Sequence, residues 1–109
     1  MTNSASFIHD LIKASSGNGI DVPDEMVFRS MYVPMEGAPQ KHPHEKTKVL
    51  LVKNPFEDAA MYWELPVSAI GRIEEVDSIV SEDGRTAMVL RLWIRKGTKA
   101  VACTPYVVT

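Results

Sequence analysis

The chain has 109 residues, with 12 lysine and arginine residues against 14 aspartate and glutamate residues, and 45% of its residues are hydrophobic. This length predicts one domain with a core of modest size. The formal net charge of -2 argues against a surface built as a whole for nucleic acid or anionic lipid.

The sequence gives no sign of membrane insertion or secretion. No run of about 18 apolar residues occurs that could form a membrane helix. The N-terminus lacks the basic stretch and apolar core of a secretory signal. Cys103 is the only cysteine, so no intrachain disulfide can form. We therefore expect a cytoplasmic protein without membrane contact.

The N-terminal segment predicts a short amphipathic helix over about residues 4–15. Its apolar side chains recur with the period of a helix and form one stripe, made of Phe7, Ile8, Leu11 and Ile12. Glycines that follow at Gly17 and Gly19 are typical of a helix end. A helix of about three turns is marginal alone, so we expect it to dock on the rest of the fold.

Residues 22–33 carry two conflicting signals. Pro23-Asp24-Glu25 is typical of a helix start. The residues from Met26 onward are rich in β-branched and aromatic side chains, which favour a strand. We predict a strand that begins near Met26.

Residues 34–47 contain three prolines and predict a long exposed loop, either functional or flexible. Within it, His42 and His44 are two residues apart, so both imidazoles point the same way in an extended chain. Two imidazoles on one side can meet a single metal ion. A metal site at His42 and His44 is therefore one hypothesis. The side chain that would complete it is Glu45, Glu36 or His9.

The middle of the chain predicts two strands around a helical turn. Residues 49–52 form a continuous apolar run and predict a buried strand. Residues 54–57 are typical of a helix start, and residues 62–65 return to extended structure. Aromatic-rich walls suit small-ligand pockets, which gives a second hypothesis. Its lining would be Tyr32, Met61, Tyr62 and Trp63.

The last forty residues predict a three-stranded meander with strands over about 70–80, 86–96 and 99–108. Gly84 suits the left-handed position of the first turn, and Gly97 suits a two-residue type II′ turn. These turns place Ser81 opposite Arg85, Lys96 opposite Lys99 and Glu75 opposite Arg91.

The predicted register gives the meander a core face and an amphipathic face. The core face comprises Val76, Val80, Met88, Leu90, Leu92, Ile94, Val101, Cys103 and Val107. A thiol at Cys103, opposite Leu92, would be a buried and unreactive small hydrophobe. The other face carries an apolar patch that a subunit interface would explain. Its contact residues would be Ile73, Val89, Arg91, Trp93 and Tyr106.

Charge is segregated along the chain. Residues 57–83 hold eight acids and one base, whereas residues 85–99 hold five bases and no acid. Arg91, Trp93 and Arg95 share one strand face, as in binders of single-stranded nucleic acid. The net charge disfavours that function, and pairing of the acidic strand with the basic strand is the simpler explanation.

Together these patterns predict an α+β, mainly β fold. We expect an antiparallel sheet of about five strands, or a small open barrel, with the N-terminal helix packed on it. For function we expect a non-enzymatic binding or assembly module that forms a homo-oligomer, most simply a dimer, and needs no cofactor. A protein partner, a metal-dependent role, a small-ligand pocket and nucleic-acid binding through residues 85–99 are the alternatives.

Overall fold

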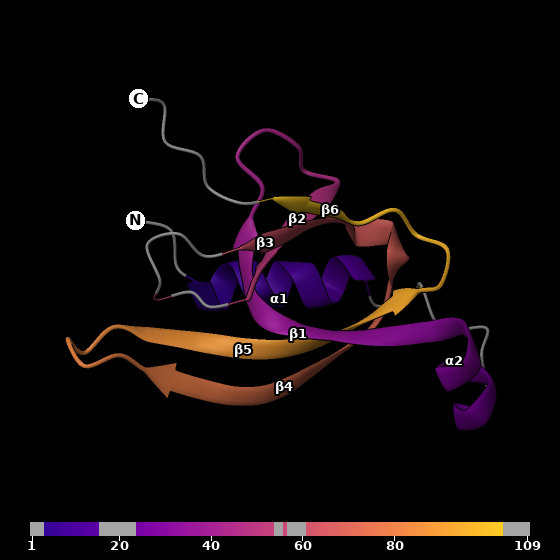
Figure 1. Cartoon of the computed structure of the whole chain (residues 1–109), viewed down its shortest axis with the longest axis horizontal. Helices are drawn as coiled ribbons and strands as arrows, with labels where there is room; N and C mark the ends of the chain where they lie inside the picture. The colour runs from indigo at the N-terminus through magenta and orange to yellow at the C-terminus, as the bar shows by residue number, and fades with distance from the viewer. Residues whose placement is uncertain (1–3, 16–23, 54–55, 57–60, 104–109) are drawn as a thin grey trace.

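The computed structural model describes residues 4–15, 24–53, 56 and 61–103, and Figure 1 shows how the elements are arranged. The helices are α1 (Ser4–Ser15), α2 (Glu25–Met31) and the single 3-10 turn η1 (Val67–Ala69). The strands are β1 (Tyr32–Lys41), β2 (Lys48–Val52), β3 (Tyr62–Pro66), β4 (Ile70–Val80), β5 (Thr86–Arg95) and β6 (Val101–Cys103). They form one antiparallel sheet in the order β4-β5-β1-β2-β3-β6, which is not closed into a barrel. The α+β prediction is confirmed.

Strand β1 joins the two halves of the sheet, and it corrects the prediction of a loop over residues 34–47. Residues 32–37 pair with β5, and residues 38–41 pair with β2. Among the described strands, each half of β1 is therefore bonded along one side only. Proline has no backbone N–H to donate. Pro34 and Pro39 therefore fit in β1, because the backbone nitrogen of each can face the side of the strand that has no hydrogen-bonded neighbour. Only residues 42–47 remain as a connection to β2.

Helix α2 corrects the prediction of a strand from Met26. The Asp24 side chain accepts a hydrogen bond from the Met26 N–H at 2.7 Å and caps the helix, as the Asp-Glu pair had indicated. Phe28 is buried beneath the helix, while Met26 and Val27 face outward. One buried aromatic residue thus outweighs the strand propensity of the segment.

Strand β6 corrects the third strand of the predicted meander. It pairs with β3 rather than β5, and Cys103 lies opposite Tyr62 instead of Leu92. The Thr98 N–H bonds to the Arg95 carbonyl at 3.2 Å, and Gly97 has a φ of 86°. The chain therefore turns one residue earlier than predicted and crosses to the other half of the sheet. Residues 104–109 lie outside the described residues. So does the helix predicted after Asn54, of which only Phe56 and Met61 are described.

The β4–β5 hairpin has the predicted turn but not the predicted register throughout. At its tip the Ser81 N–H bonds to the Arg85 carbonyl at 2.8 Å, and Gly84 has a φ of 84°. A β-bulge between Glu75 and Asp77 then shifts the pairing by one residue. As a result Glu74, and not Glu75, lies opposite Arg91.

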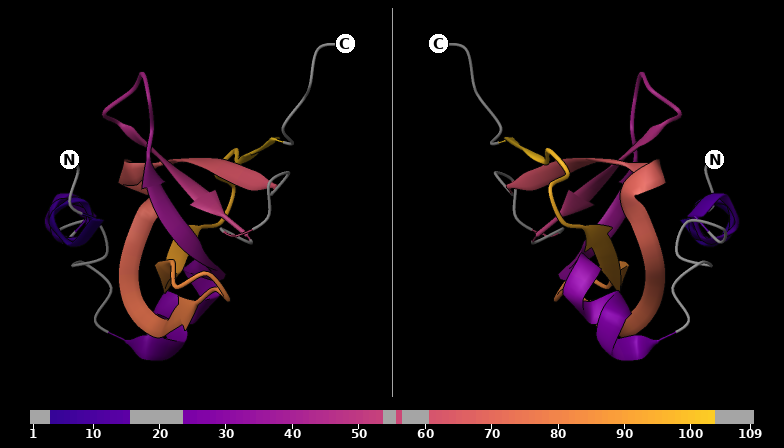
Figure 2. Two further views of the ribbon diagram at one scale, coloured as in Figure 1. Left: turned by 90° about the vertical axis from the view of Figure 1, so that its left-hand side faces the viewer. Right: turned by 90° about the vertical axis from the view of Figure 1, so that its right-hand side faces the viewer.

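The core lies between α1 and the curled sheet, and Figure 2 shows the helix end-on beside the sheet. Ile8 and Leu11 of the predicted helical stripe supply its α1 side. The sheet and η1 contribute Val49, Leu51, Leu65, Ala69, Ile70, Leu90, Leu92 and Ile94. Within the described residues, no helix is both long and apolar enough to cross a membrane.

Candidate functional site

The predicted interface residues do not share one face. Val89, Arg91 and Trp93 lie on the same side of β5, as alternation requires. Ile73, however, is opposite Leu92 and packs against the main core, because the bulge before Asp77 reverses the side on which it points. Tyr106 lies outside the described residues.

Helix α2 covers Trp93. The Phe28 ring stacks on Tyr32 with centroids 4.4 Å apart and meets Trp93 at 5.7 Å. These three residues form a second buried cluster, in which Trp93 is only 6% exposed. The indole is therefore not presented for base stacking or for direct contact with another subunit.

Charged side chains hold α2 in this position. The Arg72 guanidinium donates two hydrogen bonds of 2.8 Å to the Glu25 carboxylate and lies over the Phe28 ring at 4.0 Å. Arg29 adds a third bond to Glu25, of 3.0 Å, and lies over Trp93 at 5.4 Å. Chiefly the Arg72 hydrogen bond, and next the Arg29 bond, lower the pKa of Glu25 from 4.5 to about 2.

A row of charges crosses three strands beside this cluster. Arg91 donates to Glu36 on β1 at 3.2 Å and lies 3.7 Å from Glu74 on β4. The Glu74 carboxylate also accepts the indole N–H of Trp93. The row therefore pairs the charge of Arg91 with carboxylates on both neighbouring strands.

One end of the long axis is the outer half of the β4–β5 hairpin, residues 75–87, here called the acidic arm (Figure 1). Val76 is 40% exposed and Val80 is 65% exposed, although both were predicted to lie in the core. Four carboxylates stand against one cation, Arg85, which pairs with Asp83 at 2.9 Å. None of the described residues forms an ion pair with the other three, Glu75, Asp77 and Glu82.

The opposite end carries the reverse charge. It comprises residues 24–33, Arg72 and residues 95–99, here called the basic end, and the Lys96 N–H ties the last segment to α2 through a 2.8 Å bond to the Met31 carbonyl. Its exposed apolar side chains are Met26 at 81%, Val27 at 47% and Val33 at 45%. Its cations are Arg29, Arg72, Arg95, Lys96 and Lys99, against the carboxylates Asp24 and Glu25. Arg95, Lys96 and Lys99 have no ion-pair partner within the described part of the chain.

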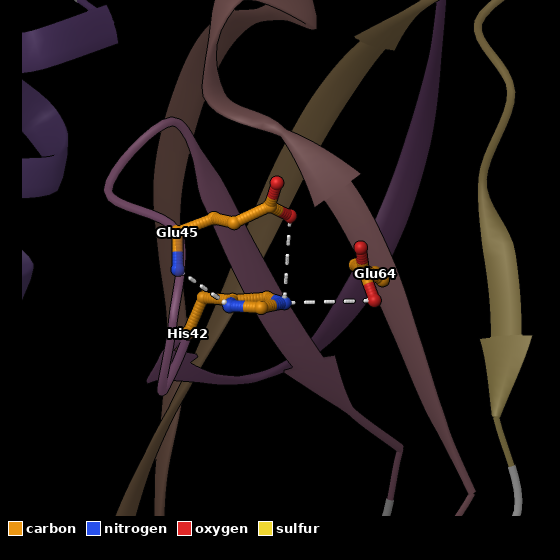
Figure 3. Close-up of side chains that lie close together, drawn as sticks. All are labelled: His42, Glu45 and Glu64. Carbon is orange, nitrogen blue, oxygen red and sulfur yellow. Dashed lines mark hydrogen bonds and ion pairs between the residues drawn. The ribbon is translucent and has the colours of Figure 1, made fainter.

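A third polar group gathers where β1 turns into β2 and meets β3. His42, Glu45 and Glu64 place one possible metal-ligand atom each within 4.8 Å of one another (Figure 3). His44 is not in this group. Lys48 lies between the carboxylates, with Nζ 2.9 Å from Glu45 and 2.8 Å from Glu64. The Lys48 hydrogen bond is the main cause that lowers the pKa of Glu64.

The hydrogen bonds of His42 favour a turn-closing role over metal binding. Its Nδ1 accepts the backbone N–H of His44 at 3.1 Å and that of Glu45 at 2.9 Å. A neutral imidazole with an acceptor Nδ1 carries its proton on Nε2. That Nε2 faces Glu64 at 3.6 Å and Glu45 at 4.0 Å. A metal at Nε2 would need the proton moved to Nδ1, against two N–H donors, and would also have to displace Lys48.

The predicted ligand pocket is divided between two regions. Tyr32 belongs to the cluster under α2, whereas Trp63 packs against the main core. Tyr62 on β3 lies opposite Cys103 on β6, and the hydrogen bond between the two side chains raises the pKa of Tyr62. Met61 is half-buried and immediately precedes β3. The four residues therefore do not line one wall.

Sequence reasoning missed Lys48 and Glu64 as partners of the His42 connection. Alternation along β3 could have placed Glu64 on the side opposite buried Leu65. Its closeness to His42, however, follows from the long-range pairing of β3 with β2 and could not be predicted. No known family, curated protein or solved structure matches the chain.

Proposed function

We propose that this protein is a small non-enzymatic assembly module that associates with further copies of itself through the two ends of its long axis. The observation that carries this proposal is the exposure of apolar side chains at both ends, next to charges without partners among the described residues. Exposed apolar side chains grouped beside charges are typical of protein contacts.

The remaining polar clusters support a structural role rather than catalysis. Three of the carboxylates already accept hydrogen bonds from other side chains: Glu25 from an arginine, Glu74 from a tryptophan and Glu64 from a lysine. His42 uses Nδ1 to close a turn. Groups held in ion pairs and turn hydrogen bonds have little freedom to bind or exchange protons with a substrate.

The binding energy would come mainly from the valines and the methionine at the ends. Full burial of such a side chain contributes on the order of 1.5–3 kcal/mol. The exposed set is small, so the association should be weak and concentration-dependent.

Sedimentation velocity from low micromolar to millimolar protein tests the proposal. Wild-type protein should show a rising average mass, and the double variant Val76→Ser with Val80→Ser should remain closer to a monomer. Ile12→Ser is the matched control, because Ile12 is 40% exposed on α1, which lies between the two ends (Figure 1). A wild-type protein that stays monomeric throughout this range would refute self-association.

A further inference from the structure

We propose that the acidic arm of one copy docks on the basic end of the next, so that the protein assembles head to tail. This inference rests on the proposed self-association and names its geometry. The occupant of each surface is a second copy of this chain, and the argument is the complementarity of the two ends.

The two ends match in charge. The acidic arm has four carboxylates and one cation, which leaves an excess of three negative charges. The basic end has five cations and two carboxylates, which leaves an excess of three positive charges. Opposite potentials of this kind orient two surfaces during encounter and fix their register.

The two ends also match in their apolar content. Val76 and Val80 on the arm have counterparts in Met26, Val27 and Val33 at the basic end. Each set stands beside the charges of its own end, so both kinds of contact can form in one docking. Apolar burial would supply most of the affinity, and the charges would select the partner end.

A two-fold pairing of β4 with a second β4 is disfavoured. It would bring Glu75 and Asp77 close to the same carboxylates of the other copy. The Ser81 N–H bonds to Arg85 and so faces β5, and backbone N–H groups alternate in direction along a strand. The Ser78 N–H therefore faces the outer edge of β4, where the Asp77 carboxylate accepts it at 2.7 Å. An edge that is bulged, acidic and capped in this way resists further strand pairing.

Head-to-tail contacts are heterologous, and such contacts close into rings or continue as chains. This arrangement permits a test by charge exchange. Glu75→Lys with Glu82→Lys makes both ends of the molecule basic. Lys96→Glu with Lys99→Glu makes both ends acidic. Lys41→Glu with Lys46→Glu is the matched control, because these exposed lysines lie outside both ends.

Sedimentation and circular dichroism of each variant and of an equimolar mixture decide the question. Each end variant alone should fold but associate about tenfold more weakly, whereas the control should associate like wild type. The mixture of the two end variants should regain wild-type association, since basic and acidic ends again meet. If wild type associates but the end variants behave like it, or the mixture fails to recover, the head-to-tail geometry is wrong and self-association stands. A monomeric wild type would instead overturn the proposed function itself.

Discussion

The Arg72 guanidinium donates two hydrogen bonds of 2.8 Å to the Glu25 carboxylate and so connects β4 to α2. Arg72 also lies over Phe28, the residue that α2 buries against Trp93. A seven-residue helix is too short to persist alone. Its position over the sheet therefore depends on this ion pair and on the aromatic cluster beneath it.

Acid should loosen α2. The pKa of Glu25 is lowered from 4.5 to about 2, so its contribution is complete above pH 4.5 and is lost as the pH falls toward 2. In a Trp63→Phe background, the emission of Trp93 should shift to longer wavelength over that interval. Glu25→Gln should show the shifted emission already at neutral pH. An acid-insensitive spectrum, or one that Glu25→Gln leaves unchanged, would contradict this role of Glu25.

Gly71 should be difficult to replace. A Cβ on Gly71 would overlap the ring of Tyr32, which packs directly over this position. We expect Gly71→Ala to lower the free energy of unfolding by about 1–3 kcal/mol through overpacking. Ser68→Ala, at an exposed neighbouring position, should change it by less than about 0.5 kcal/mol. Urea unfolding measures both, and equal stabilities would show that the ring moves aside freely.

His42 should act through its Nδ1. His42→Ala removes the acceptor for two backbone N–H groups and should cost about 1 kcal/mol. His42→Asn places an amide oxygen at the corresponding position and should recover most of this loss, as asparagine does in turns. Thermal unfolding of both variants provides the comparison. If asparagine is no better than alanine, the contacts of Nε2 with the carboxylates matter more.

The same variant tests the metal hypothesis. Because Nδ1 accepts two backbone N–H groups and Lys48 pairs with both carboxylates, we expect no stoichiometric Zn²⁺ binding at micromolar concentrations. Isothermal titration of wild type and His42→Asn measures this. Binding by wild type that the asparagine variant abolishes would establish a metal site in place of a turn.

Local signals in the sequence predicted the elements with local causes. Gly84 set the tip of the β4–β5 hairpin, and the apolar stripe of α1 supplied Ile8 and Leu11 to the core. The bulge before Asp77 has no such signal. It turns Ile73 into the core and exposes Val76, so the faces predicted for these two residues were wrong.

Long-range pairing accounts for two further errors. Pro34 and Pro39 suggest a loop unless β1 is known to exchange its partner from β5 to β2 halfway along its length. Cys103 could be placed beside Tyr62 only by knowing that β6 crosses to β3. The segregation of acids and bases along the chain suggested that the two stretches would cancel each other by strand pairing. Their separation to the two ends of the long axis follows from the fold (Figure 1).

The most direct test of self-association through the two ends is a dilution series followed by backbone amide NMR. Concentration-dependent shifts should appear in the acidic arm, in α2 and in residues 95–99, and they should shrink together as salt is added. The amides of residues 42–48 should not move. Shifts confined to that connection, or no shifts at millimolar protein, would contradict assembly through the ends.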